Sequence, residues 1–297
     1  MTVTALAGLQ LLNTSKLTIK AKFVLIISMS LNLAGKKFLV TGAGRGIGRA
    51  IAETLNKQGS IVYALNRSKE PLYSLVQQCP GIKPIQADMR NWDEIRDKLK
   101  DLKPLDGLVN NAGKVNFITQ SALDYPRESI AEYVDVQIYG MINTIQIVGS
   151  TMVKAGKPGS IVNLSSTLGH RALRGILPYC VTKAAVEMIT KQFAVELGVH
   201  NIRVNSVNPT WVRTEYFESR IGEGFNLDKM VAEINPRGRM CELMESVWPV
   251  LYLLSDLSSF VSGTFNLIDG AMLSTLTLPG EYETDLNQSV GGGKRAK

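Results

Sequence analysis

The sequence alternates short, continuous apolar runs with longer stretches of amphipathic helical pattern, and this alternation limits the fold more than any other feature. Strands that are apolar on both faces belong in a parallel sheet covered by helices on both sides. No Pro/Gly-rich linker and no internal repeat divides the chain. We therefore predict an α/β fold, a single doubly wound Rossmann domain with a seven-stranded parallel sheet. The expected strands cover 37–40, 61–65, 82–87, 107–110, 160–164, 203–207 and 264–268, and the expected helices cover 47–58, 69–78, 91–100, 127–155, 179–198 and 242–255.

The two ends of the chain differ from the part between them. Residues 1–28 contain no acidic residue, and their one apolar run, 23–27, is too short to cross a bilayer. Met29 opens a stretch that reads as a natural start, so we expect 1–28 to be a poorly ordered N-terminal extension, with a mitochondrial targeting role as the alternative. The domain is predicted at 29–275, and 276–297 as a polar C-terminal tail. No transmembrane segment is expected.

Cysteine, histidine and charge counts narrow the class of protein. Three widely spaced cysteines indicate reduced thiols, which favours a cytoplasmic location. With only two histidines and no paired cysteines, no metal site is expected. Much of the net charge of +7 comes from lysines and arginines in the two tails. We therefore predict no nucleic-acid partner.

A glycine-rich turn follows the first expected strand. It reads TGAGRGIG, with Gly42, Gly46 and Gly48 leading into a helical pattern. Glycines at such a turn permit a tight bend and close approach of the backbone to a pyrophosphate, which the helix N-terminus then holds. The spacing differs from G-x-G-x-x-G, because Ile47 and Arg49 stand where that motif needs glycine.

The end of the second expected strand indicates which dinucleotide binds. An NAD site usually has a carboxylate there for the ribose 2′-hydroxyl, but this chain has ALNRS at 64–68. Arg67 and Arg45 could instead pair with a 2′-phosphate through charge-assisted hydrogen bonds. The prediction is NADP(H).

A tyrosine and a lysine lie one helical turn apart at Tyr179 and Lys183. The nearby ammonium is expected to lower the tyrosine pKa from near 10, so that the phenol can exchange a proton with a carbonyl oxygen. Ser166, at the end of the fifth strand, could hydrogen-bond the same oxygen. Further polar groups end the fourth strand at Asn110 and follow the sixth as NPT.

Together the segments TGAGRGIG, NNAG, YCVTK and NPT, with Ser166, resemble the short-chain dehydrogenase/reductase family. Within it, LAGKKFLVTGAGRGIGRA, CPGI, PYCVTK and IRVNSVNPT are similar to the dicarbonyl/L-xylulose reductase subfamily, from about Met29 to Asp269. The resemblance implies an NADPH-linked reductase of α-dicarbonyls and small sugars such as L-xylulose, which assembles as a homotetramer through the long helices near 127–155 and 179–198.

The resemblance also implies residue roles. Tyr179 would be the acid, Lys183 its partner and ribose ligand, and Ser166 the ligand of the substrate oxygen. Gln137 stands where the family has an asparagine that holds a water of the proton relay, and its extra methylene displaces the amide. The predicted catalytic set is Ser166, Tyr179, Lys183 and Gln137, and the predicted cofactor set is Gly42, Arg45, Gly46, Ile47, Gly48, Arg67, Asp88, Met89, Asn110, Ala112, Gly113, Tyr179, Lys183, Pro209, Val212 and Thr214.

Two other functions stay open at this point. A 3-oxoacyl thioester reductase would carry the same motifs. A dinucleotide-binding protein with little catalysis is suggested by Gln137, although Ser166, Tyr179 and Lys183 argue against it.

Overall fold

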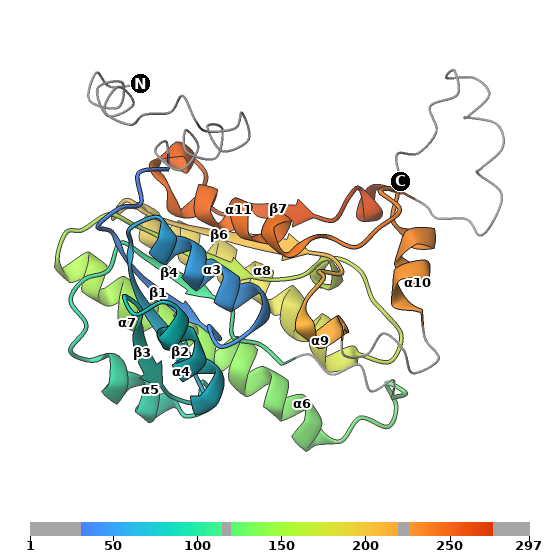
Figure 1. The fold of residues 1–297 in the computed structure, drawn as a ribbon. Helices are drawn as coiled ribbons and strands as arrows, with labels where there is room; N and C mark the ends of the chain where they lie inside the picture. The colour runs from blue at the N-terminus through green and yellow to red at the C-terminus, as the bar shows by residue number, and fades with distance from the viewer. Residues whose placement is uncertain (1–30, 115–119, 219–225, 276–297) are drawn as a thin grey trace, which may run out of the picture.

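Seven parallel strands form the sheet at the centre of the molecule, in the order β3-β2-β1-β4-β5-β6-β7 (Figure 1). The computed structural model describes residues 31–114, 120–218 and 226–275, so the expected N-terminal extension and C-terminal tail lie outside the described residues. The predicted doubly wound sheet is confirmed. Its strands are β1 (Lys37–Thr41), β2 (Ile61–Asn66), β3 (Lys83–Gln86), β4 (Gly107–Asn110), β5 (Gly159–Leu164), β6 (Ile202–Pro209) and β7 (Phe265–Ile268).

The order of the strands places a crevice next to β1. The chain moves outward from β1 to β2 and β3, then returns to add β4 on the other side of β1. The connections after β1 and β4 therefore leave the sheet in opposite directions. In open parallel sheets, ligands bind at the carboxyl ends of the strands beside this reversal.

Alternating apolar side chains give each face of the sheet its own core. In β1, Phe38 and Val40 pack into one core and Leu39 into the other, and all three are fully buried. The helices also divide between these two cores, one group packing on each face of the sheet (Figure 1). The first core takes α3 (Gly46–Lys57), α4 (Lys69–Gln78) and α11 (Leu243–Leu254), and the second takes α5 (Trp92–Leu99), α7 (Gly140–Lys154) and α8 (Leu177–Gly198).

One predicted helix is interrupted. The pattern over 127–155 predicted a continuous helix, but the structure has α6 (Arg127–Val134), a π-helical turn η2 (Asp135–Tyr139) and then α7. A π-turn is wider than an α-turn and often occurs at functional sites. Here it contains Gln137, whose side chain is fully buried. The amphipathic pattern continues through the π-turn, so nothing in the pattern predicted the interruption.

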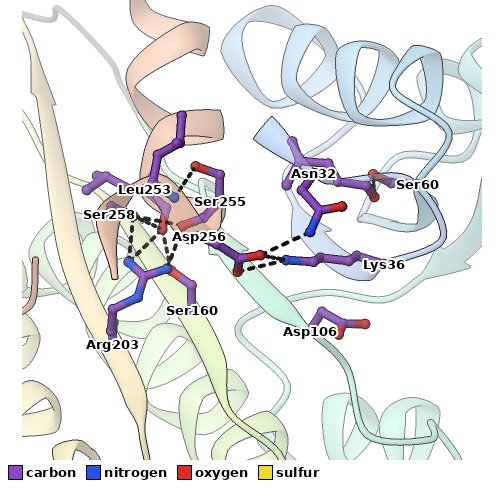
Figure 2. A network of polar contacts seen from close by, with 12 residues as sticks. Asn32, Lys36, Ser60, Asp106, Ser160, Arg203, Leu253, Ser255, Asp256 and Ser258 are labelled. Carbon is purple, nitrogen blue, oxygen red and sulfur yellow. Dashed lines mark hydrogen bonds and ion pairs between the residues drawn. The ribbon is translucent and has the colours of Figure 1, made fainter. Parts of the chain in front are cut away.

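Arg203 on β6 holds the C-terminal end of α11 against the sheet (Figure 2). Its guanidinium donates to the carbonyl oxygens of Leu253 at 2.9 Å and Ser255 at 3.0 Å, and to Ser258 Oγ at 2.7 Å. Ser160 Oγ on β5 donates to the same Leu253 oxygen at 2.7 Å. A charged donor therefore satisfies carbonyls that the end of a helix leaves without partners.

We expect Arg203→Met to lower the free energy of unfolding by about 2 kcal/mol, because these oxygens lose a charged donor in a partly buried place. Urea unfolding measures the loss. The exposed Arg171→Met is the matched control and should stay within about 0.5 kcal/mol of the parent. Equal stabilities of the two variants would contradict this role for Arg203.

Candidate active site

The turn between β1 and α3 requires glycine for two separate reasons. Gly42 and Gly46 have φ angles of +66° and +54°, in the left-handed region that side chains rarely adopt. A Cβ at Gly42 would lie 2.7 Å from the Ala112 Cα, and one at Gly48 would lie 2.4 Å from the Gly42 oxygen. The bare backbone leaves the N-terminal end of α3 open toward the carboxyl edge of the sheet.

Thr41 ties this turn to the end of β4. Its Oγ1 accepts hydrogen bonds from the backbone N–H groups of Asn111 and Ala112, both at 3.1 Å. The Asn111 amide donates back to the carbonyl oxygens of Thr41 at 3.2 Å and Gly42 at 3.1 Å. The two strand ends beside the crevice are therefore held as one unit.

A cavity of about 660 Å³ opens at this edge. Most of the residues predicted for the site line it, together with others that sequence reasoning missed, such as Arg90 and Lys114. The predicted residues on its wall are Gly42, Arg45, Gly46, Ile47, Arg67, Asp88, Met89, Ala112, Gly113, Ser166, Tyr179, Pro209, Val212 and Thr214. Gly48, Asn110, Gln137 and Lys183 lie behind the wall.

Asn110 corrects one expectation. Its side chain is buried, donates to Asn163 Oδ1 at 3.0 Å and accepts from Thr144 Oγ1 at 2.7 Å. These partners turn the amide into the sheet and away from the cavity, so the side chain is not placed for the predicted contact with the cofactor. Asn111 and Ala112, the next two residues, line the cavity instead.

One end of the cavity is basic. Arg45 and Arg67 line it, and neither guanidinium makes a hydrogen bond or an ion pair within the described part of the chain. No carboxylate ends β2, where the Asn66 amide donates to the Ser68 oxygen at 2.8 Å. Two free guanidinium groups beside an open helix N-terminus suit a phosphate.

Arg90 adds a third cation that the sequence did not single out. It forms an ion pair with Asp88 at 2.6 Å. Burial raises the pKa of Asp88, but the hydrogen bonds and charge of Arg90 outweigh it and hold that pKa below its usual value. The carboxylate of Asp88 is therefore ionised and paired with Arg90. The arginine two residues after Asp88 was the only signal in the sequence.

Ser166 and Tyr179 meet inside the cavity. Ser166 follows β5 and caps the short helix η3 (Thr167–Gly169), with its Oγ accepting from the Leu168 N–H at 3.1 Å. Tyr179 lies in the first turn of α8, which Pro178 opens in a position that suits proline. The Tyr179 hydroxyl is hydrogen-bonded to Ser166, and both residues line the cavity.

Lys183 lies behind them, one turn along α8. Only 5% of the residue is exposed, and its Nζ donates to the Leu164 oxygen at 2.7 Å. Nζ is 5.5 Å from the centre of the Tyr179 ring. Burial lowers the pKa of Lys183 to about 8, against the opposing charge of Glu187.

The prediction that Lys183 lowers the pKa of Tyr179 is wrong. Burial raises the pKa of Tyr179 to about 12, and the hydrogen bond with Ser166 offsets only part of that rise. Desolvation prevails because Nζ turns toward Leu164 and not toward the hydroxyl. At neutral pH the phenol therefore keeps its proton, which is the form that an acid needs.

Gln137 packs against the same helix. Its Nε2 donates to Thr182 Oγ1 at 2.6 Å, while its Oε1 is buried without a hydrogen-bond partner among the described residues. A Cβ built on Gly113 would lie 2.7 Å from that oxygen, so the amide fills the space behind the cavity wall. An asparagine, one methylene shorter, could not span the same distance.

The segment after β6 covers the cavity with aromatic rings. Trp211 and Phe217 line it and meet edge to face, with ring centres 5.6 Å apart. The segment continues through α9 (Glu215–Glu218) and α10 (Leu227–Ile234), and 219–225 lie outside the described residues. Leu227 and Val231 of α10 pack in the same apolar cluster as the two rings.

The described residues contain neither a membrane-spanning helix nor a cluster of metal ligands. No described helix has the length and apolar character needed to cross a membrane. No group of three or more histidine, cysteine, aspartate or glutamate side chains in 31–114, 120–218 and 226–275 is arranged to hold a metal ion.

Comparison with known proteins identifies relatives over most of the chain. The family model described as enoyl-(acyl carrier protein) reductase matches residues 42–272. A D-erythrulose reductase from Gallus gallus is 41% identical, covering 82% of this chain and 98% of its own. An L-xylulose reductase from Mus musculus and a carbonyl reductase [NADPH] 2 from Sus scrofa are each 39% identical, covering 83% of this chain and all of theirs.

Solved structures agree with this fold. A short-chain type dehydrogenase/reductase from Mycobacterium marinum superposes with a TM-score of 0.77 at 33% identity, covering 83% of this chain and 98% of that one. A gluconate 5-dehydrogenase from Burkholderia cenocepacia, solved in complex with NADP and tartrate, has the same TM-score at 25% identity and the same coverage.

The buried ammonium predicts a pH dependence of stability. The pKa of Lys183 is about 8 in the folded protein and near 10.5 in the unfolded chain, so between these values the unfolded chain binds more protons and stability gains as pH rises. The gain from this residue is at most about 3 kcal/mol. Relative to Lys183→Met, the parent should therefore become more stable from pH 7.5 to 10 in urea unfolding.

Lys191→Met, an exposed change on the same helix, is the control and should show a difference from the parent that does not vary with pH. A constant difference for Lys183→Met as well would mean that Lys183 titrates as an ordinary lysine.

Proposed function

Because the chain belongs to the short-chain dehydrogenase/reductase family, we propose that it is an NADPH-dependent carbonyl reductase with Ser166, Tyr179 and Lys183 at its catalytic centre. The observation that carries the proposal is that Ser166 and Tyr179 line the same cavity that the glycine turn opens, with Lys183 Nζ 5.5 Å from the tyrosine ring centre. Its substrates are small ketones, α-dicarbonyls and ketoses such as L-xylulose.

The residues present fit a dinucleotide, and NADP(H) better than NAD(H). The turn after β1 offers bare backbone and the N-terminus of α3 to a pyrophosphate. Arg45 and Arg67 line the cavity and have no hydrogen-bond or ion-pair partner among the described residues, so their guanidinium groups suit a 2′-phosphate. β2 ends without the carboxylate that an NAD site uses. One relative carries NADPH in its name, and one similar structure was solved with NADP.

The side chains support reduction. When bound, NADPH supplies the hydride. Ser166 donates a hydrogen bond to the carbonyl oxygen, and Tyr179 transfers its proton to the same oxygen as negative charge develops there. With its pKa raised to about 12, Tyr179 holds that proton throughout the neutral range.

Lys183 and Gln137 support the first turn of α8. Lys183 keeps positive charge behind the tyrosine at neutral pH, where it favours the phenolate left by proton transfer. Gln137 takes the place of the relay asparagine of the family, and its hydrogen bond to Thr182 fixes that turn. Its unpaired oxygen could accept from the water of a relay.

The relatives narrow the substrate class. They are named as reductases of L-xylulose, D-erythrulose and carbonyl compounds, which share a small carbonyl next to an oxygen-bearing carbon. In this chain, Trp211 and Phe217 give the cavity an apolar wall, and the hydroxyl groups of Ser166 and Tyr179 give it a polar one. A small diketone, polar at one edge and apolar at the other, matches both walls.

One alternative has a specific observation in its favour. The matching family model is named after a reductase of substrates carried as acyl thioesters. An NADPH-consumption screen over diketones, ketoses and 3-oxoacyl thioesters separates the two activities, and cofactor binding without turnover would indicate a binding protein.

The outer surface of α8 supports self-association. Val181, Met188 and Val195 recur every seven residues and are 51%, 61% and 77% exposed in the single chain. Apolar residues at this spacing form a stripe that another helix can cover. We infer a homotetramer in which α8, with α7, packs against copies of itself.

We expect Tyr179→Phe to lower kcat with diacetyl by about 10²–10⁴-fold, because the substrate oxygen loses its acid. NADPH should still bind, as measured by the change in its fluorescence. Tyr73→Phe, at an exposed tyrosine, is the matched control. Turnover by Tyr179→Phe as fast as that of the parent would show that another group supplies the proton.

Arg67→Ala should weaken NADPH binding about tenfold to a hundredfold and leave NADH binding nearly unchanged, because only NADPH has the 2′-phosphate. Titration with both dinucleotides measures the two constants, with the exposed Arg171→Ala as control. Equal losses for NADPH and NADH would refute the assignment of the phosphate to Arg67.

A further inference from the structure

A buried carboxylate lies behind the catalytic helix and has no part in the chemistry described above. Glu187 follows Lys183 by one helical turn on α8 and Tyr179 by two, so the three side chains lie along one stripe. Only 7% of Glu187 is exposed. A buried carboxylate is costly unless it is paired and hydrogen-bonded, so its surroundings must justify it.

Neutral donors from β6 hold this carboxylate. Asn208 Nδ2 donates to Oε1 at 2.5 Å, and Ser206 Oγ donates to Oε2 at 3.1 Å. His170 Nε2, at the end of η3, lies 3.9 Å from Oε1 and 3.1 Å from the Asn208 amide. Within the described ranges, no lysine or arginine forms an ion pair with Glu187.

The same contacts lead to the substrate-binding serine. Asn208 Nδ2 also donates to the backbone oxygen of Ser166, at 3.4 Å. Ser166 Oγ lies 3.5 Å from the oxygen of Pro209, the residue after Asn208 and part of the cavity wall. Glu187 therefore orients the amide that joins the loop after β5 to the end of β6.

The charge of Glu187 also acts on Lys183. Burial lowers the pKa of Lys183, and Glu187 is the charged group that opposes this effect. The other titratable groups that the described residues place near the stripe are Tyr133 on α6, Cys180 on α8 and His170 after η3. At this point β5 and β6 face the stripe with the neutral groups Leu164 O, Ser206 and Asn208.

We propose that Glu187 is a positioning residue of the catalytic centre, whose carboxylate holds Asn208 against Ser166 and places a negative charge one helical turn from Lys183. The proposal rests on the proposed function. A carboxylate that served only to hold α8 on β6 would change stability when replaced, and would leave the pH dependence of the reaction where it is.

The test is the pH profile of kcat/KM for reduction of diacetyl by NADPH in Glu187→Gln. Glutamine keeps the shape and removes the charge, so the alkaline limb should move down by about one pH unit. The loss against the parent should be about eightfold at pH 8.5 and under twofold at pH 6. Glu196→Gln, an exposed acid further along α8, should leave the limb in place.

Glu187→Asp keeps the charge and should move the limb by less than half as much, so it decides the matter if Glu187→Gln does not fold. An alkaline limb at the parent's pH in Glu187→Gln overturns the proposal. A limb that moves as far in Glu187→Asp as the full pH unit expected for Glu187→Gln also overturns it, because the charge would then not set the limb.

A readout without turnover separates this proposal from the proposed function. Lys183 can be followed by NMR of its labelled ammonium, assigned with Lys183→Arg. If the parent reduces no carbonyl, the proposed function fails. A lower titration midpoint of Lys183 in Glu187→Gln than in the parent would still support the action of Glu187 on the lysine, and an unchanged midpoint would refute it.

Discussion

The site depends on how closely two backbones approach at the carboxyl edge of the sheet. Gly42 lies so close to Ala112 that a Cβ on Gly42 would clash with the Ala112 backbone. At the same point, the Thr41 hydroxyl accepts hydrogen bonds from the N–H groups of Asn111 and Ala112, which follow β4. This contact brings the ends of β1 and β4 together beside the reversal of strand order and leaves the start of α3 open. The remaining groups, including Arg67 and the Ser166–Tyr179 pair, come from strand ends that meet at this edge because the strands are parallel.

Burial has the largest effect on the pKa values of Tyr179 and Lys183. Burial raises the pKa of Tyr179 to about 12 and lowers the pKa of Lys183 to about 8. At neutral pH the site therefore holds a neutral phenol beside an ammonium group that is more acidic than that of an ordinary lysine. A protonated phenol is suited to reduction. The charge of Glu187, one turn further along α8, works against the loss of the ammonium. The catalytic helix therefore carries an acid, a cation and an anion in succession, each separated by one turn.

The features that follow periodicity and motif were predictable. Seven apolar runs gave the sheet, since residues such as Phe38, Leu39 and Val40 are buried on both faces, and the glycine spacing gave the turn after β1. The features that follow from three-dimensional neighbours were not. The π-turn at Gln137 leaves the helical pattern intact. The Asn110 amide turns inward because it donates to Asn163 and accepts from Thr144, and Arg90 reaches the cavity wall beside Asp88. The predicted lowering of the Tyr179 pKa was wrong. The spacing in the sequence shows that a lysine is close, but it does not show how much burial raises the pKa of the phenol.

In the proposed mechanism, one oxygen of the substrate meets Ser166 and Tyr179 at the edge of the sheet where the glycine turn would hold the dinucleotide. A crystal structure of the complex with NADP⁺ and the alcohol product of the best substrate tests it most directly. We expect the alcohol oxygen to lie within about 2.6–3.2 Å of both the Tyr179 hydroxyl and Ser166 Oγ, with the pyrophosphate at the start of α3. An alcohol oxygen beyond hydrogen-bond reach of both side chains would contradict it.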